Sequence, residues 1–273
     1  MKRLAIHSPP RSGSTWLGAI FDSHPSVIYK HQPLFSYTFK DYLGFESTQE
    51  DIKTFFHELA STQDDFLDRT KQKEEGVFPQ FEKTSTEAVV YKEVRYHHLL
   101  AYLLATDPQL RVIGLLRNPV GTIHSWLSIP KEFDPSWDSL KQWEYAPKRN
   151  QGRPEEYFGY QKWKEVAWMF QYLSQAYPDR FVSITYEALN DAPKDIAQAL
   201  FSFGGLEWNM QTEDFLSQST STASEATYGV YRKKKKSYRH ADRLQPEIKQ
   251  AILEDPEFEI LCSIYNWDLE ALE

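Results

Sequence analysis

The sequence predicts an α/β fold in which a parallel β-sheet is covered by helices on both faces. Short apolar runs, typical of buried strands, alternate along the chain with segments whose apolar residues recur at helical spacing. Strands that are separated by helices are joined by crossover connections, which make neighbouring strands parallel. A parallel sheet is buried on both faces, and this agrees with strand segments that are apolar throughout.

The first strand and helix are expected at the N-terminus. Residues 4–7 form a short apolar run that ends at Ser8-Pro9-Pro10, and we expect a buried strand there. A helix is expected next, with Ser14 or Thr15 available as its N-cap and His24-Pro25 at its end. Its apolar face would consist of Trp16, Leu17, Ile20 and Phe21.

The same alternation continues along the chain. Further strands are expected at 89–91, 111–116 and 181–186, and further helices at 97–105, 120–128, 155–177, 194–203 and 246–264. There is no internal repeat. Segments rich in Pro or charge, such as residues 134–154, keep aromatic residues and lack the Gly/Ser bias of a flexible linker. We therefore expect a single domain over residues 1–273.

Composition indicates a globular protein with a large core and excludes several partners. Hydrophobic residues make up 41% of the 273 residues and aromatic residues 15%, so a disordered chain is not expected. The formal net charge of -8 argues against a general nucleic-acid or anionic-membrane surface, because such surfaces need an excess of Lys and Arg. Neither nucleic acid nor a membrane is expected as a partner, and any polyanion site must be local.

Cysteine content and hydropathy predict a cytoplasmic protein. Cys262 is the only cysteine, which excludes an intramolecular disulfide and a structural zinc site made of cysteines. The apolar run after Met1-Lys2-Arg3 is too short for a signal peptide, and no segment approaches the ~20 apolar residues of a membrane span.

Residues 9–16, Pro-Pro-Arg-Ser-Gly-Ser-Thr-Trp, lie between the first predicted strand and the first predicted helix. Backbone N–H groups at a helix N-terminus carry partial positive charge, so a loop that enters a helix there can bind a phosphate. Gly13 would let the backbone approach an anion closely, Arg11 would add a guanidinium, and hydroxyls would come from Ser12, Ser14 and Thr15. A plain turn with an N-cap is the alternative interpretation of this loop.

A nucleotide kinase with an atypical phosphate loop is an alternative that the sequence disfavours. The pattern Gly-x-x-x-x-Gly-Lys-[Ser/Thr] is absent, because no Lys precedes Ser14 or Thr15. The strand at 111–116 leads into Arg117 where an acidic metal ligand might have stood. No metal site is therefore expected.

Arg117 and Ser125 form a second candidate site. Arg117 lies at the carboxyl end of a predicted strand, where ligands bind in open α/β sheets, and Ser125 lies about two turns into the next helix. Both side chains can face one phosphate. An ordinary surface arginine and a helix hydroxyl are the alternative.

Together these segments resemble the sulfotransferases that use 3'-phosphoadenylyl sulfate (PAPS), a family with a P-loop NTPase-like sheet that lacks the Walker lysine. Residues 10–15 are similar to the family's loop for the 5' phosphosulfate, and Arg117 to Ser125 are similar to its element for the 3' phosphate. The resemblance covers nearly the whole chain and is nearer the carbohydrate-type branch. Further matches are His24-Pro25, Pro33-Leu34, Lys92, Tyr177 to Phe181, Tyr186 to Leu189, and Phe203 to Leu206.

The resemblance implies roles for additional residues. Trp16 belongs to the implied cofactor-binding set, and Lys92 together with Arg11 would neutralise charge on the transferred sulfuryl group. The only strong basic run, Tyr231 to Lys236, occupies the place of the family's late Arg-rich loop. Arg232, Lys233 and Arg239 are thus candidates for the 3' phosphate, although most of that run's lysines are expected to be solvated.

The general base is where the sequence departs from the family. The carbohydrate-type enzymes carry a Glu just before Pro-Leu, whereas this chain has Gln32 before Pro33-Leu34. An amide is not a useful base at neutral pH. His31 is therefore the first candidate for the base and Glu93 the second, while a structural histidine is the alternative for His31.

The expected function is transfer of a sulfuryl group from PAPS to a hydroxyl or amine of a small acceptor, with release of 3'-phosphoadenosine 5'-phosphate (PAP). The acceptor could be a sugar, a phenol or another metabolite, and no motif identifies it. The alternatives are the nucleotide kinase and a non-catalytic module that binds PAP or a polyanion.

Overall fold

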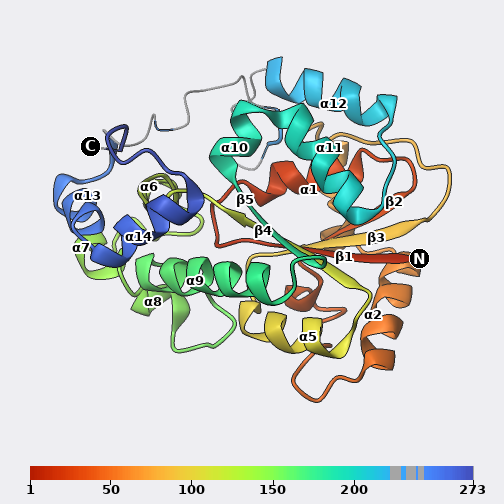
Figure 1. Ribbon diagram of the computed structural model, residues 1–273, viewed down its shortest axis with the longest axis horizontal. Coiled ribbons are helices and arrows are strands. Elements are labelled where there is room, and N and C mark those ends of the chain that lie inside the picture. Colours follow the sequence, from red (N-terminus) through yellow and green to blue (C-terminus); the bar gives the residue numbers. More distant parts are fainter. Residues whose placement is uncertain (222–228, 232–237, 239–242, 273) are drawn as a thin grey trace.

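The computed structural model describes residues 1–221, 229–231, 238 and 243–272, and its centre is a five-stranded parallel sheet (Figure 1). The strand order is β2-β3-β1-β4-β5, and every neighbouring pair is parallel. The strands are β1 (Lys2–His7), β2 (Val27–His31), β3 (Ala88–Glu93), β4 (Leu110–Leu116) and β5 (Phe181–Thr185). The expected parallel α/β fold is therefore confirmed.

The four strands that the sequence predicts are present, and the structure adds one more. The edge strand β2 is absent from the prediction because its sequence, Val-Ile-Tyr-Lys-His, is short and ends in two polar residues. The last predicted strand ends one residue early, since Tyr186 begins a helix whose N-cap is Thr185.

The described residues include these helices: α1 (Ser14–Asp22), α2 (Gln49–Ser61), α3 (Asp65–Asp68), α4 (Thr70–Glu74), α5 (Leu100–Thr106), α6 (Pro119–Leu127), α7 (Ser139–Gln142), α8 (Pro147–Asn150), α9 (Tyr160–Ala176), α10 (Tyr186–Asp191), α11 (Pro193–Gly204), α12 (Met210–Ser221), α13 (Pro246–Leu253) and α14 (Pro256–Tyr265). Single 3-10 turns, η1 (Pro33–Phe35) and η2 (His97–Leu99), follow β2 and precede α5. Within these residues, no helix is long and apolar enough to cross a membrane.

Three predicted helices differ from the observed ones. The helix expected at 97–105 begins with the 3-10 turn η2, and α5 starts only at Leu100. The helix expected at 155–177 begins only at Tyr160, because Gly159 has a φ of 91° that a helix does not continue through. The helix expected at 246–264 is two helices, since the side chain of Asp255 caps a new helix at Pro256.

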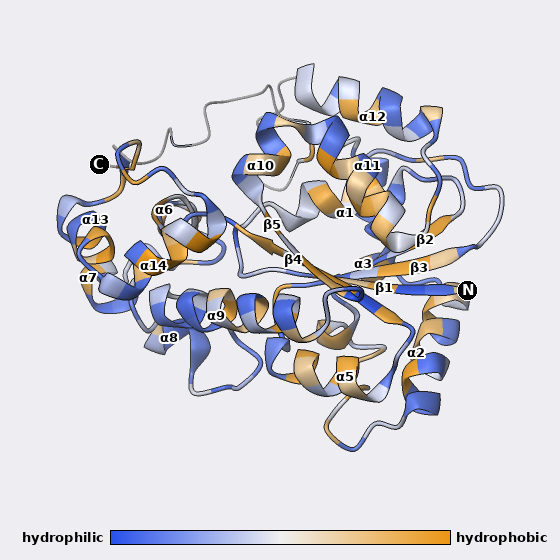
Figure 2. Ribbon diagram, viewed as in Figure 1, coloured by the Kyte–Doolittle hydropathy of each residue, from blue (hydrophilic) through white to orange (hydrophobic). Residues whose placement is uncertain are grey.

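The sheet separates two apolar layers. Alternate side chains of β3 point to opposite faces: Val90 packs with residues of α1, α11 and α12, whereas Val89 and Tyr91 pack with residues of α2, α5 and α9. Figure 1 shows these two groups of helices on opposite sides of the sheet. In Figure 2 the hydrophobic colour is concentrated in the strands and on the helix sides that face them.

The chain turns in opposite directions after two adjacent strands, β1 and β4. From β1 it passes through α1 to β2 at one edge of the sheet, and from β4 it passes to β5 at the other edge. In open α/β sheets the ligand site lies beyond the carboxyl ends of the strands at such a reversal. This place in the fold holds the site described next.

Candidate functional site

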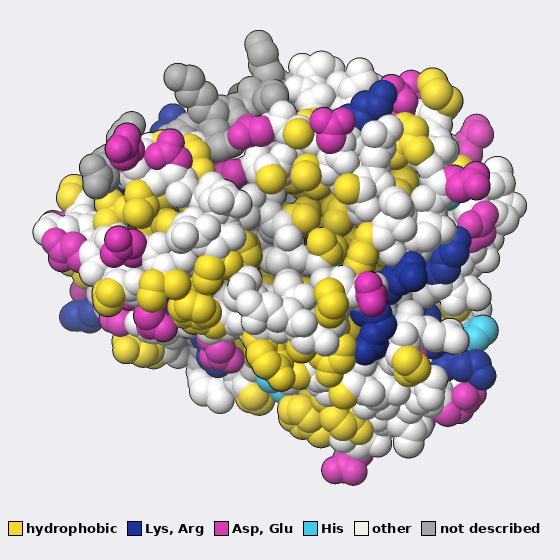
Figure 3. Space-filling view, viewed as in Figure 1, with side chains coloured by type: hydrophobic (Ala, Val, Ile, Leu, Met, Phe, Trp, Pro, Cys, Tyr) yellow, Lys and Arg dark blue, Asp and Glu magenta, His cyan; other side chains and the backbone are white. Residues whose placement is uncertain are grey.

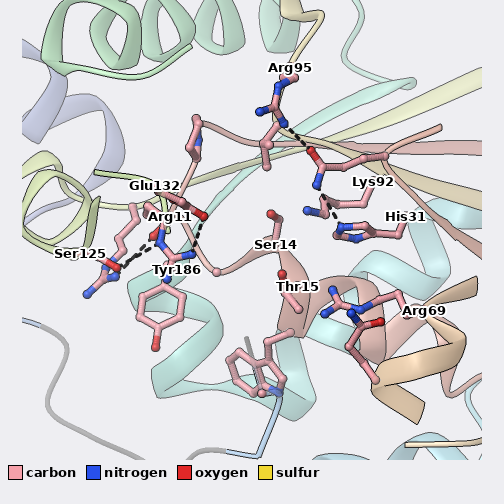
Figure 4. A pocket seen from close by; sticks show the side chains of 18 of the residues that line it. Arg11, Ser14, Thr15, His31, Arg69, Lys92, Arg95, Ser125, Glu132 and Tyr186 are labelled. Atoms are coloured by element: carbon pink, nitrogen blue, oxygen red, sulfur yellow. Dashed lines mark hydrogen bonds and ion pairs between the residues drawn. The ribbon is translucent and has the colours of Figure 1, made fainter. Parts of the chain in front are cut away.

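A cavity of about 440 Å³ lies at the carboxyl edge of the sheet. Its wall includes residues that follow each of the five strands, together with residues of α1, α3 and α8. The volume falls within the range of small-molecule and cofactor sites. Figure 4 shows a group of these side chains around the start of α1.

The loop before α1 has the geometry of an anion cradle. Gly13 is the N-cap with a φ of 94° and supplies no side-chain cap, so the expectation that Ser14 or Thr15 caps the helix is wrong. Both residues instead belong to the first turn of the helix, and both line the cavity. The first amides of a helix have no intrahelical partner, so these N–H groups can bind an anion.

Both the backbone conformation at position 13 and the neighbouring side chain require a glycine there. A Cβ atom at this position would lie 2.5 Å from Cδ2 of Tyr186, and an L-residue is strained at this φ. Tyr186 stands at the start of α10, directly after β5, and its ring therefore closes one side of the loop. Ser12 differs from its neighbours because it is fully buried and does not line the cavity.

Arg117 and Ser125 line the same cavity, and Arg11, which the resemblance places at the 5' phosphosulfate, lies beside Ser125 (Figure 4). Nε of Arg11 donates to Oγ of Ser125 at 3.3 Å, and Nη1 of Arg117 donates to the carbonyl oxygen of Arg11 at 3.4 Å. Arg11 also forms an ion pair with Glu132 at 3.3 Å. Three elements, the first loop, the end of β4 and α6, therefore bring two guanidiniums and a hydroxyl together.

The orientation of Arg117 depends on buried contacts around it. Its guanidinium lies 5.0 Å from the centre of the Tyr186 ring, and Gly121 provides the space for its side chain. The next residue, Asn118, donates its Nδ2 to the buried carboxylate of Glu187 at 2.6 Å, and Trp267 donates to the same carboxylate at 2.9 Å. These hydrogen bonds hold the turn at the end of β4.

Lys92 and His31 lie side by side on β3 and β2. They are register partners, so both side chains emerge on the face of the sheet that carries α1. The Lys92 side chain is buried rather than exposed, and burial, reinforced by Arg69, lowers the pKa of its ammonium to about 7. Burial and the cations Lys92, Arg69 and Arg95 lower the pKa of His31 well below its usual value, so its ring is neutral at pH 7.

Glu93 lies on the opposite face from Lys92 and does not line the cavity. Its Oε1 accepts a hydrogen bond from the backbone N–H of Leu34 at 2.8 Å, which supports the turn η1. Burial raises the pKa of this carboxyl group. The period of two residues in a strand thus separates the two adjacent candidates, Lys92 and Glu93.

A chain of hydrogen bonds fixes the His31 ring (Figure 4). Arg95 donates to Oε1 of Gln32 at 2.9 Å, and Nε2 of Gln32 contacts Nε2 of His31 at 3.0 Å. Because the Gln32 oxygen accepts from Arg95, its amide nitrogen donates to His31, and the proton of the ring is assigned to Nδ1. Glu156 holds Arg95 in turn through an ion pair at 3.0 Å.

Other predicted residues lie at the margin of the site or outside the described part of the chain. Trp16 lines the cavity, and its Nε1 donates to Oγ of Ser219 at 3.1 Å. Arg232, Lys233 and Arg239 lie outside the described residues.

Several residues that line the cavity are not among those predicted from the sequence: Arg69, Arg95, Glu132, Arg149, Phe158 and Tyr186. Tyr186 is the first residue after β5 and Arg95 the second after β3, and these positions could have indicated them. Arg69 and Arg149 come from short helical segments between strands, so only the folded chain brings them to the site.

The lining is strongly basic in an acidic protein. It contains seven cationic side chains and two carboxylates, Asp65 and Glu132. On the face of the molecule seen in Figure 3, by contrast, acidic side chains lie among the basic ones. Within the described residues, no three His, Cys, Asp or Glu side chains are grouped as a metal site would require.

The family of the chain follows from comparison with known proteins. The family model described as Sulfotransferase family matches residues 4–210, so the chain belongs to the sulfotransferase family, a family of transferase enzymes. A comparison with curated proteins gave no match.

Solved sulfotransferase structures share the fold. A sulfotransferase from Alicyclobacillus acidocaldarius aligns with a TM-score of 0.59 at 14% identity, and the alignment covers 100% of this chain and 98% of that one. The sulfotransferase domain of the Synechococcus PCC 7002 olefin synthase aligns with a TM-score of 0.54 at 14% identity, covering 97% and 94% of the two chains. Mouse sulfotransferase SULT7A1, complexed with PAP, gives the same TM-score and identity, with coverage of 96% and 88%.

Proposed function

We propose that this protein transfers a sulfuryl group from PAPS to a hydroxyl or amine of a small acceptor and releases PAP. The observation that carries the proposal is the convergence of the Gly13 loop, Lys92, Arg117 and Ser125 on one basic cavity. These are the groups that a nucleotide with anionic ends would need. The presence of PAP in the complex of the mouse relative supports the same donor.

The 5' phosphosulfate would bind at the start of α1. Ser14 and Thr15, in the first turn of α1, line the cavity there together with Lys92 of β3. Charge builds up on the oxygen between phosphorus and sulfur as the S–O bond breaks, so a fixed cation at this point favours the transition state. Arg11 adds a second cation near the same loop.

The 3' phosphate would bind at Arg117 and Ser125. Arg117 presents a planar fork of donors that suits a phosphate, and Ser125 adds a hydroxyl from α6. That Arg232, Lys233 and Arg239 also bind the 3' phosphate remains a prediction from the sequence.

His31 is the base that we propose for the acceptor. In the transfer, the acceptor oxygen or nitrogen forms a bond to sulfur, the bond from sulfur to the bridging oxygen breaks, and its electron pair leaves with PAP. The acceptor proton must go to a base. His31 lines the cavity beside Lys92 and is neutral, whereas Glu93 does not line it. Its Nε2 would exchange the hydrogen bond from Gln32 for one from the acceptor.

Calorimetric titration followed by a turnover assay tests the function. PAP should bind without magnesium and more tightly than ATP with magnesium, and a saturating dose of ~100 Kd should stabilise the fold by about 2.7 kcal/mol. Turnover of PAPS against a library of sugars, phenols and amines should then give a sulfated product. A preference for ATP with magnesium would favour a kinase, and PAP binding without transfer to any acceptor would favour a binding module.

A further inference from the structure

The cavity contains a second basic group beyond the residues assigned to the donor. Arg69, Arg95 and Arg149 line it together with the aromatic side chains Phe66 and Phe158. This inference rests on the proposed function, because it treats the donor as bound by Arg11, Lys92, Arg117 and Ser125.

Arg149 is held in place and lies close to an aromatic ring. Its guanidinium carbon is 4.5 Å from the centre of the Phe158 ring, and its Nε is buried with no hydrogen-bond partner among the described residues. The side chain of Asn150, the next residue, forms two hydrogen bonds with the backbone of Phe158. Its Nδ2 donates to the carbonyl oxygen at 2.8 Å, and its Oδ1 accepts from the N–H at 3.1 Å. The short helix α8 is thereby fixed to the cavity wall.

Arg95 has a similar setting and donates to Gln32, the hydrogen-bond partner of His31. Its guanidinium lies 3.9 Å from the centre of the Phe35 ring, and Glu156 fixes it through Nε. Glu156 is also 3.4 Å from Arg153, so it is shared between two guanidiniums. Burial lowers the pKa of Arg149, and Arg95 and Arg153 add to this effect while Glu156 and Glu132 oppose it. The lining of the cavity as a whole carries seven cationic side chains and two carboxylates, so positive charge is in excess there.

Arg69 adds a third guanidinium on the side of His31. It has 6% of its surface exposed, lies 4.5 Å from the centre of the Phe78 ring, and takes a left-handed backbone conformation with a φ of 55°. Its charge is close enough to lower the pKa values of both Lys92 and His31. Figure 4 shows Arg69 and Arg95 on either side of Lys92 and His31.

A neutral acceptor would remove water from these guanidiniums without compensating their charge, which is unfavourable. A carboxylate would compensate it, because its two oxygens match the planar donor fork of an arginine. The nearby rings of Phe158 and Phe66 can pack on the acceptor's body.

We propose that the acceptor carries a carboxylate in addition to the hydroxyl or amine that is sulfated, and that Arg149 and Arg95 bind this carboxylate. His31, Arg95 and Arg149 line the same cavity, so the reacting group would face His31 while the carboxylate faces the arginines. The enzyme would thus select acidic acceptors over neutral ones of the same shape.

Matched pairs of probes test the proposal: 4-hydroxybenzoate against its methyl ester, and glucuronic acid against glucuronamide. Binding of each is measured by calorimetry on the PAP-loaded protein and on the protein alone. We expect at least one carboxylate to bind at least about tenfold more tightly than its neutral partner. Arg149→Gln should remove most of that difference. Lys148→Gln, an exposed neighbour on the same helix that does not line the cavity, should leave it intact.

The outcomes separate this inference from the proposed function. Equal binding of acid and neutral probes, no binding of either carboxylate at millimolar concentration, or equal effects of Arg149→Gln and Lys148→Gln would overturn the inference. Failure of PAP to bind in the titration described under Proposed function would instead overturn the proposed function. The preference for a carboxylate would then be decided by the binding of the acid and neutral probes to the protein without PAP.

Discussion

Replacing Arg117 with Met should selectively weaken binding of the 3' phosphate. Met keeps most of the side-chain length but removes the charge and the donors. A charge-assisted hydrogen bond contributes about 1.5 to 3 kcal/mol, which corresponds to roughly a 10- to 150-fold loss of affinity for PAP. Adenosine 5'-phosphate lacks the 3' phosphate, so its affinity should change by less than about threefold.

The structure indicates a modest stability cost for the same substitution. Among its contacts, Arg117 donates to the carbonyl of Arg11 at a long 3.4 Å and lies 5.0 Å from the centre of the Tyr186 ring. These two contacts alone suggest a loss of about 1 to 2 kcal/mol in the free energy of unfolding, and the lost charge near the buried carboxylate of Glu187 adds to it. Urea unfolding then shows whether the variant is folded under the titration conditions.

Two control variants define the specificity of this effect. Ser125→Ala removes an uncharged donor and should cost PAP about 0.5 to 1.5 kcal/mol. Arg111→Met removes the same charge from β4, the strand that Arg117 follows, but Arg111 does not line the cavity and donates to the carbonyl of Phe203 at 2.7 Å. Arg111→Met should lower the free energy of unfolding, but the ratio of the affinity for PAP to the affinity for adenosine 5'-phosphate should not change. Equal losses for both nucleotides in Arg117→Met would refute the assignment.

Three further predictions concern the reacting end of the cavity. Because the pKa of Lys92 is lowered to about 7, its ammonium is charged below that pH, so kcat/KM for PAPS should fall as pH rises above it. Lys92→Met should be slower throughout and lack this alkaline limb; an unchanged limb would assign it to another group. His31→Ala should lower kcat by roughly two to four decades at nearly constant PAP affinity, and adding Gln32→Glu should restore part of the loss by supplying a carboxylate. Near-normal kcat in His31→Ala would exclude His31 as the base. Gly13→Ala should lower the free energy of unfolding by about 1 to 2 kcal/mol in urea titrations, since its Cβ would approach Tyr186 to 2.5 Å and its φ is 94°; full stability would show that the loop relaxes freely.

The fold class, and the place of the Gly13 loop and the Arg117–Ser125 pair at strand ends, could be predicted from the sequence because their signals are local. Strand and helix periods are set by neighbouring residues, and the order of apolar runs is enough to predict parallel strands. The loop with Gly13 and the Arg117–Ser125 pair each lie at a strand end, where the fold class itself places the ligand. Their convergence on one cavity followed from that position.

The tertiary structure decided which side chains reach that cavity and in what state. Lys92 and Glu93 are adjacent in sequence, but only the packing of the sheet determines which of them faces α1. Arg69 and Arg149 are far apart in the chain, and no local pattern relates them to the site. The buried state of Lys92 and the neutral state of His31 arise from burial and from cations such as Arg69, whose electric fields act through space and not along the sequence.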